Sequence, residues 1–256
     1  MATNLNGGGL VDSHFQAVGD AATTAVASAI SGSHLSNPNG GAPARAIDIN
    51  DLVALLRDST VMMAITHGFA LGFDDPFGNS VWWNEQISFD VTDRIVAKVA
   101  AGIPGYNVVT FWSCDTLSGG NAPVAAFGLS GDDRAYAGFT DKVAINCWFK
   151  STWDASGRGG PSGPYEATLA DHAYYFWVSF QGGATFKEAL DDANGHVMPH
   201  TIDPETGARS MLPMDLRGDQ YATINFVYFT ESERQLLVGS PNGVTVWLTK
   251  LPVTGN

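Results

Sequence analysis

Two apolar runs decide the fold predicted for this chain, and they read Val61-Met62-Met63-Ala64-Ile65-Thr66-His67-Gly68 and Val108-Val109-Thr110-Phe111-Trp112-Ser113-Cys114. Continuous apolar runs of this length are typical of strands that are buried on both faces, as in a parallel sheet. Each run leads into a reactive residue, an imidazole in the first and a thiol in the second. Ligands of open α/β sheets bind beyond the carboxyl ends of such strands, so the runs predict a nucleophile–base pair there.

The segment between the two runs is predicted to form a crossover helix from Val91 to Ala101. Asp90 suits its N-cap, apolar residues recur at helical spacing, and Gly102 and Pro104 follow its end. Strand, helix and strand make a right-handed βαβ unit. Such a unit brings His67 and Cys114 to the same edge of the sheet, although 47 positions separate them in the sequence (114 − 67 = 47).

The length and composition fit one large α/β domain or one domain with an appendage. The chain has 256 residues, of which 45% are hydrophobic, and this is enough apolar material for a large core. Its formal charge is −13, with 26 acidic and 13 basic residues, which argues against nucleic acid as a partner. We find neither a signal-like N-terminus nor an apolar run of membrane-spanning length, so we expect a cytoplasmic protein that does not bind membranes.

The rest of the chain divides into an appendage and further sheet and helix elements. Residues 1–43 are rich in Gly, Ala, Ser and Asn and are predicted to be an N-terminal appendage, and residues 44–256 form the domain. The pattern predicts a weak strand at Ala46–Ile49, a short helix over 52–56, a hairpin over Val81–Phe89, a strand at Ala135–Ile145, a loop over 151–164, helices at Leu169–Phe180 and Thr185–Ala193, an irregular stretch over His196–Asp219, and strands at Thr223–Phe229 and Val244–Leu248.

The chain has two cysteines, Cys114 and Cys147, which are too few for a disulfide framework. Two interpretations of Cys114 stay open. It is a reactive thiol, or it is a small buried hydrophobe that pairs with Cys147 in an oxidising compartment. His67 has a similar alternative as a plain turn residue before Gly68. The two residues together, at the ends of neighbouring strands, favour catalysis.

An apolar strand ending in His-Gly, followed by one ending in Ser-Cys, resembles the caspase-like cysteine peptidases. The matching segments are Met62–Gly68 and Val109–Thr116, and the elements downstream follow in the expected order to Phe229. The resemblance implies a three-layer α/β/α fold with a mostly parallel central sheet, formed by residues 44–256. Family members have two strands before the histidine strand, and this sequence offers at most one weak candidate there.

The resemblance also implies roles for the residues at the strand ends. Cys114 would attack the scissile carbonyl, and His67 would protonate the leaving amine from across the substrate rather than pair tightly with the thiolate. The backbone N–H groups of Gly68 and Cys114 would stabilise the oxyanion. We expect no metal and no cofactor. Pro199 breaks the helix that a zinc pair formed by His196 and His200 would need.

Three further residues are candidates for substrate binding. Ser113 would shape the pocket for the residue before the scissile bond (P1), as the equivalent strand end does in relatives. Asp115 and Asp141 are candidates for an acidic pocket that takes arginine or lysine, although a turn cap is the simpler interpretation of Asp115. The loop around Arg158 is either a self-processing site or a plain surface connection.

Two functions therefore stand as hypotheses. The first is a cysteine endopeptidase that acts on a peptide or protein substrate through His67 and Cys114. The second is a catalytically inactive binding or assembly module on the same scaffold, which the missing early strand and the N-terminal appendage favour. An acyl transferase or ligase using the same acyl-enzyme is a variant of the first.

Overall fold

A computed structural model of the 256-residue chain describes residues 61–65, 67–74, 80–83, 87–91, 94–98, 106–150, 167–223, 234–238 and 245–249. Four predictions lie outside these ranges: the appendage over 1–43, the strand at 46–49, the helix over 52–56, and the loop over 151–164 with Arg158. Of the strand predicted over Thr223–Phe229, only Thr223 is described. No helix in the described part of the chain is long and apolar enough to cross a membrane.

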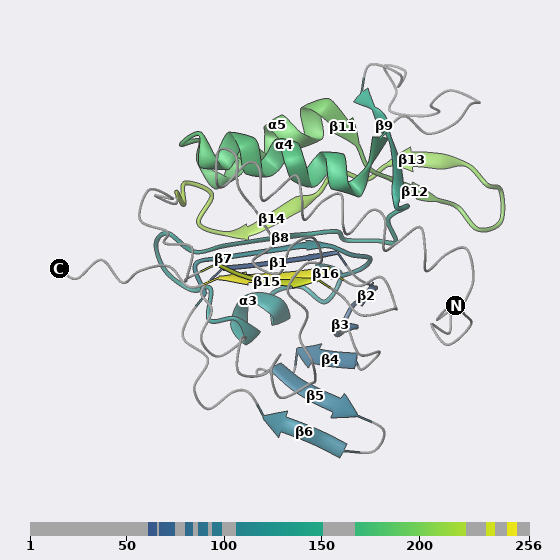
Figure 1. Ribbon diagram of the computed structural model, residues 1–256. Helices are drawn as coiled ribbons and strands as arrows, with labels where there is room; N and C mark the ends of the chain where they lie inside the picture. Colours follow the sequence, from purple (N-terminus) through teal and green to yellow (C-terminus); the bar gives the residue numbers. More distant parts are fainter. Residues whose placement is uncertain are drawn as a thin grey trace, which may run out of the picture.

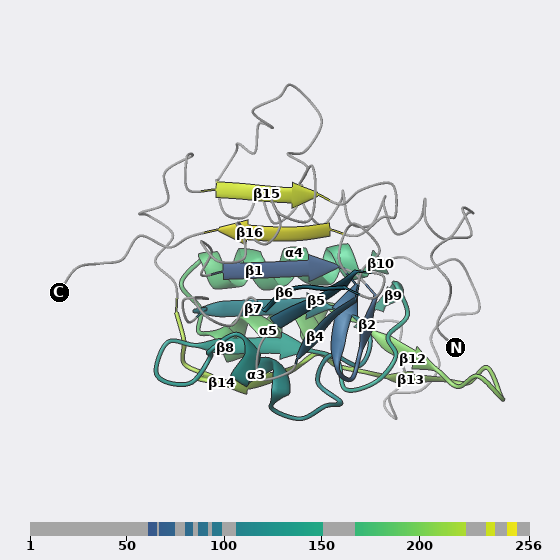
Figure 2. The ribbon, with the colours of Figure 1, turned by 90° about the horizontal axis from the view of Figure 1, so that it is seen from below.

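A six-stranded mixed sheet organises the molecule, in the order β14-β8-β7-β1-β16-β15 (Figure 2). Its centre is parallel: β1 (Val61–Ile65) pairs with β7 (Val108–Trp112), and β7 pairs with β8 (Ala135–Gly138). The flanking strands are antiparallel, with β14 (Asp215–Gly218) beside β8, and β16 (Thr245–Thr249) between β1 and β15 (Arg234–Val238). The predicted α/β class is thus confirmed, but the sheet, which was predicted to be mostly parallel, is only partly parallel: the pairs β1-β7 and β7-β8 are parallel, and the other neighbouring pairs are antiparallel.

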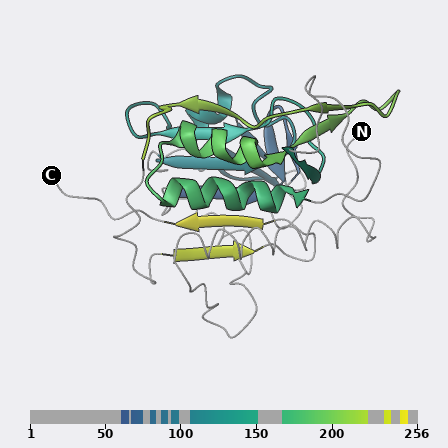
Figure 3. The ribbon, with the colours of Figure 1, turned by 90° about the horizontal axis from the view of Figure 1, so that it is seen from above.

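Both faces of the central strands are covered, as their unbroken apolar sequences predict. All five residues of β7 are buried. On one face, the helices α4 (Leu169–Gln181) and α5 (Phe186–His196) lie side by side across the sheet (Figures 1 and 3). Met63, Ile65 and Trp112 contribute to the core beneath these helices. The predictions of both helices are confirmed to within three residues at each end.

The opposite face carries an aromatic core and a second sheet (Figure 1). Phe111 of β7 packs against Phe73, Phe127 and Tyr136, with ring centroids 4.8 to 6.1 Å apart. The short helix α3 (Ala122–Ala126) lies on this side. The second sheet is an antiparallel meander of β2 (Gly68–Phe69), β3 (Gly72–Asp74), β4 (Ser80–Trp83), β5 (Ile87–Val91) and β6 (Arg94–Lys98).

This meander overturns the predicted crossover helix. Residues 87–91 and 94–98 form antiparallel strands in which Val91 pairs with Arg94, where we expected one helix from Val91 to Ala101. The segment is rich in β-branched residues, which favour a pleated strand and restrict side-chain rotamers in a helix. The predicted hairpin over 81–89 is confirmed, because β4 pairs with β5.

The later part of the chain needs three smaller corrections. The strand predicted over 135–145 ends at Gly138. The stretch 196–219, predicted to be irregular, contains β11 (Val197–Met198), β12 (His200–Ile202), β13 (Arg209–Met211) and β14. Of these, β11 pairs with β9 (Asn146–Phe149), which also pairs with β10 (Ala167–Thr168), and β12 and β13 form a hairpin. The closing strand predicted over 244–248 is confirmed as β16, and β15 was missed.

The neighbour of β1 on the side away from β7 is β16, a strand from the C-terminal part of the chain. β16 pairs antiparallel with β1 along its full length, from Val61 opposite Thr249 to Ile65 opposite Thr245. Pairing between strands this far apart in sequence leaves no local pattern, so the position of β16 was not visible in the sequence.

Candidate functional site

His67 and Cys114 follow the ends of two neighbouring parallel strands. The last aligned pair of β1 and β7 is Ile65 with Trp112, and each reactive residue lies two positions beyond its member of that pair. Both side chains are half-buried. The prediction that both residues reach the same edge of the sheet is confirmed, although the intervening segment contains β2–β6 instead of the expected crossover helix.

Gly68 joins the two strand ends by direct backbone contact. A Cβ atom on Gly68 would lie 2.3 Å from the carbonyl oxygen of Cys114, 2.8 Å from Cβ of Ser113 and 2.7 Å from Cγ2 of Thr116. These distances are far below van der Waals contact, so only glycine fits. The Gly that follows the histidine is therefore needed to let the chain after His67 approach the chain at Cys114.

A second glycine makes the same kind of contact from the other side. A Cβ atom on Gly119, in the turn after Cys114, would lie 2.2 Å from the carbonyl oxygen of Ala70. Ala70 belongs to the turn between β2 and β3. The His67–Gly68 hairpin and the turn over 113–120 thus pack backbone against backbone along the edge of the sheet.

The turn after Cys114 is also bonded to the segment that follows β8. The backbone N–H groups of Asp115 and Leu117 donate to the carbonyl oxygens of Asp141 (3.1 Å) and Phe139 (2.9 Å). The hydroxyl of Tyr136 donates to the carbonyl oxygen of Thr116 at 3.2 Å. Segments following β1, β7 and β8 therefore meet in one cluster around Cys114.

The Cys114 thiol lies against this third segment. Its Sγ donates to the carbonyl oxygen of Val143 at 3.6 Å. Burial raises the pKa of the thiol above its ordinary value; hydrogen bonding with the Val143 backbone lowers the pKa, the Asp115 carboxylate raises it, and Lys142 lowers it. Because the net direction is upward, the thiol is protonated at neutral pH in the free protein.

The structure brings together the two acidic candidates. Asp115 is half-buried with φ of 58°, Asp141 is exposed, and the Asp115 N–H bonds the Asp141 carbonyl. Burial raises the pKa of the Asp115 carboxyl, the negative charge of Asp141 raises it further, and Lys142 opposes them. The Asp115 carboxylate and the Lys142 ammonium group thus act on the thiol, and the Asp141 carboxylate acts on Asp115.

Ser113, the third candidate for substrate binding, is only 1% exposed. Its Oγ has no hydrogen-bond partner among the described residues. Its Cβ lies 2.8 Å from the position of a Cβ on Gly68, at the contact between the two strand ends. A buried hydroxyl without a partner is costly, and such atoms often mark a functional position.

The structure also describes the two cysteines and the histidine pair. Cys114 and Cys147 are both free thiols, so no disulfide joins them. His196 ends α5 and His200 begins β12. Among the described residues, no group of three or more His, Cys, Asp or Glu side chains is arranged to hold a metal ion.

Sequence reasoning missed two participants in this region. The Val143 carbonyl was assigned to the interior of a strand, yet it accepts a hydrogen bond from the thiol. His172, which binds Trp112 at the end of β7, carried no signal beyond its position in an apolar helix. No protein-family model and no curated protein matches this chain.

Proposed function

We propose that this protein is a cysteine endopeptidase that uses Cys114 as nucleophile and His67 as general acid. The observation that carries the proposal is the parallel register of β1 and β7, which puts both residues at equal distance beyond Ile65 and Trp112. The contact of Gly68 with the Cys114 carbonyl also supports it. This contact holds the residue next to His67 against the backbone of Cys114, and a histidine with no role at the thiol would not need it.

The proposed reaction passes through an acyl-enzyme. As Cys114 Sγ bonds to the scissile carbonyl carbon, its proton passes to His67, and His67 delivers that proton to the leaving amine as the C–N bond breaks. Backbone N–H groups of Gly68 and Cys114 stabilise the negative oxygen of the tetrahedral intermediate. Water then hydrolyses the thioester and returns the free thiol.

The raised pKa of Cys114 bears on how the two residues cooperate. A thiol that is neutral at rest is not held as a tight thiolate–imidazolium pair. This state suits a mechanism in which His67 serves the leaving group and the thiol ionises when substrate binds. It is also the observation that favours the second hypothesis, an inactive binding or assembly module, because such a thiol reacts slowly without substrate.

We extend the proposal to the finer fold class, a caspase-like domain. In its favour are the parallel core β1-β7-β8, the antiparallel β14 beside β8, and two helices across one face. The chain departs from the expected pattern on two counts. β16 and β15 lie where early strands were expected, and the meander β2–β6 with α3 lies on the side where a full helical layer was expected.

We further propose a preference for arginine or lysine at the P1 position of the substrate. Asp115 follows the nucleophile directly, and its backbone N–H donates to the carbonyl oxygen of Asp141. The Asp141 charge raises the pKa of the Asp115 carboxyl, so the two carboxylates are near enough to receive one cationic side chain together. Ser113 lines the same strand end. Lys142 partly offsets this negative charge, and an incoming basic side chain competes with it for the carboxylates.

Fluorogenic peptides that vary only at P1 test the function. We expect turnover by the wild-type protein, with arginine and lysine preferred, and loss of turnover in Cys114→Ala and His67→Ala. Cys147→Ala is the matched control, because Cys147 is also a free thiol but is buried on β9 and does not follow the end of β1 or β7.

Two results would decide against the proposal. Full turnover by Cys114→Ala excludes this nucleophile, and no turnover by the wild type on any peptide favours the binding module.

A double variant, Asp115→Asn with Asp141→Asn, tests the P1 preference separately. An unchanged ratio of kcat/KM values for arginine and leucine peptides in that variant would rule out these carboxylates as the pocket.

A further inference from the structure

A chain of buried hydrogen bonds begins at the last residue of β7. The indole Nε1–H of Trp112 donates to Nδ1 of His172 on α4 at 3.0 Å. Both side chains are completely buried. Trp112 stands two residues before Cys114, so this bond ties the end of the nucleophile strand to the helix above it.

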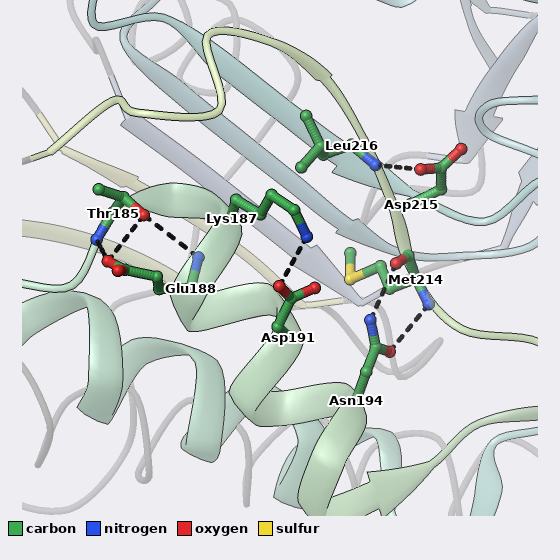
Figure 4. A network of polar contacts seen from close by, with 8 residues as sticks. All are labelled: Thr185, Lys187, Glu188, Asp191, Asn194, Met214, Asp215 and Leu216. Carbon is green, nitrogen blue, oxygen red and sulfur yellow. Dashed lines mark hydrogen bonds and ion pairs between the residues drawn. The ribbon is translucent and has the colours of Figure 1, made fainter.

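The chain continues from His172 through α5. His172 Nε2 bonds Oδ1 of Asn194 at 3.0 Å. Asn194 in turn receives the N–H of Met214 and donates its amide to the carbonyl of Met214, both at 3.0 Å (Figure 4). Met214 immediately precedes β14, the strand beside β8. The network thus links β7, α4, α5 and the start of β14.

The donors and acceptors of this network fit one protonation state. The indole N–H can only donate, so His172 Nδ1 must accept, and its proton lies on Nε2 and points at the amide oxygen of Asn194. A second proton on the ring would face the indole N–H with another N–H. Burial lowers the pKa of His172 to about 4, which keeps the ring neutral at physiological pH.

We propose that His172 is a positioning residue that fixes Cys114 through Trp112. The link is short: Trp112 is the last residue of the strand, and the turn with Cys114 starts immediately after it. Without the hydrogen bond, the indole keeps its ring contacts with the described residues, such as the edge contact with Phe176 at 6.1 Å. The catalytic consequence rests on the proposed peptidase function, whereas the effect on the Cys114 thiol does not.

The variant His172→Phe tests this inference, because it removes the acceptor and keeps a buried aromatic ring. Phe176→Leu is the matched control, since it disturbs packing against Trp112 from the same helix without breaking the hydrogen bond. Both are treated with iodoacetamide, and the labelling rates of Cys114 and Cys147 are read separately by mass spectrometry. Cys147 is buried on β9 and reports any global unfolding.

In His172→Phe we expect labelling of Cys114 on the order of tenfold faster, with Cys147 still protected. The reason is that burial is the main cause of the raised thiol pKa, and one pKa unit changes the thiolate fraction tenfold. Phe176→Leu should stay within about twofold of the wild type. His172→Asn keeps an oxygen near the Nδ1 position and should restore most of the protection.

The opposite results are clear. Cys114 labelling that is unchanged, slower, or faster together with Cys147 overturns the positioning role. If His172→Phe does not fold, Asn194→Ala breaks the same network one step away, and its labelling rates are interpreted in the same manner.

With peptide substrates, the kcat of His172→Phe should fall while its KM stays unchanged. Absence of turnover in the wild type would refute the peptidase and leave the labelling result standing.

Discussion

Gly68 shows at the scale of one residue why two distant motifs form one site. Its missing side chain lets the backbone after His67 reach the carbonyl of Cys114, where a Cβ would lie at 2.3 Å. The obstacle is backbone and not the end of a flexible side chain, so the neighbour cannot move aside cheaply. A contact of this kind constrains the separation of the histidine and the thiol.

We predict that Gly68→Ala destabilises the fold and lowers peptidase activity. Overpacking at such a contact costs about 1–3 kcal/mol, and the strand ends must separate to relieve it. Gly195→Ala is the control, because nothing lies within 4 Å of a Cβ on that exposed residue of α5. Urea titration measures the free energy of unfolding. Equal stability of Gly68→Ala and the wild type would contradict the described contact.

At the scale of elements, the two helices α4 and α5 were predictable because the residues that start each helix are close together in the sequence. α4 begins after Thr168 and α5 after Thr185, and each threonine forms a capping box with the acidic residue three positions on. In α5, Glu188 Oε2 accepts from both the N–H and the hydroxyl of Thr185 (Figure 4). These bonds lower the pKa of Glu188.

Removal of the N-cap of α5 should destabilise the protein by a modest amount. Thr185→Ala loses the hydroxyl that accepts the Glu188 N–H, and such losses cost about 1 kcal/mol. Glu188→Gln retains an oxygen that can accept from Thr185 and should cost less. Chemical denaturation of both variants checks the order. A larger loss in Glu188→Gln would show that charge near the helix start, and not the hydroxyl cap, dominates.

At the scale of the whole molecule, the central sheet is covered on both faces, and this burial predicts how stability depends on pH. His172 stays neutral beneath the helices, whereas an exposed imidazole in the unfolded chain has a pKa of 6.5. Between pH 6.5 and about 4, the unfolded state therefore binds a proton that the folded state does not. Stability from this group is complete above pH 6.5 and falls as the pH drops toward 4.

We predict that the wild type loses about 2 kcal/mol more stability between pH 7 and pH 5 than His172→Phe does. His200, whose pKa is also lowered to about 4, is present in both proteins, so its effect cancels in the difference. Urea titrations of both proteins at the two pH values give this difference. The same pH dependence in both proteins would show that His172 does not resist protonation in the folded state.

The sequence by itself determined the elements whose signals are local: the apolar strands β1, β7 and β16, the capped helices α4 and α5, and the His-Gly and Ser-Cys ends. The prediction of a helix from Val91 to Ala101 was wrong. The apolar spacing of this segment fits a helix, its β-branched residues favour strands, and no local rule decides between the two. Only the tertiary structure decided that β16 lies beside β1, that the Val143 carbonyl accepts from the thiol, and that His172 holds Trp112. These are contacts between residues 29 to 188 positions apart (143 − 114 = 29; 249 − 61 = 188), and the chain's packing, rather than any nearby pattern, brings them together.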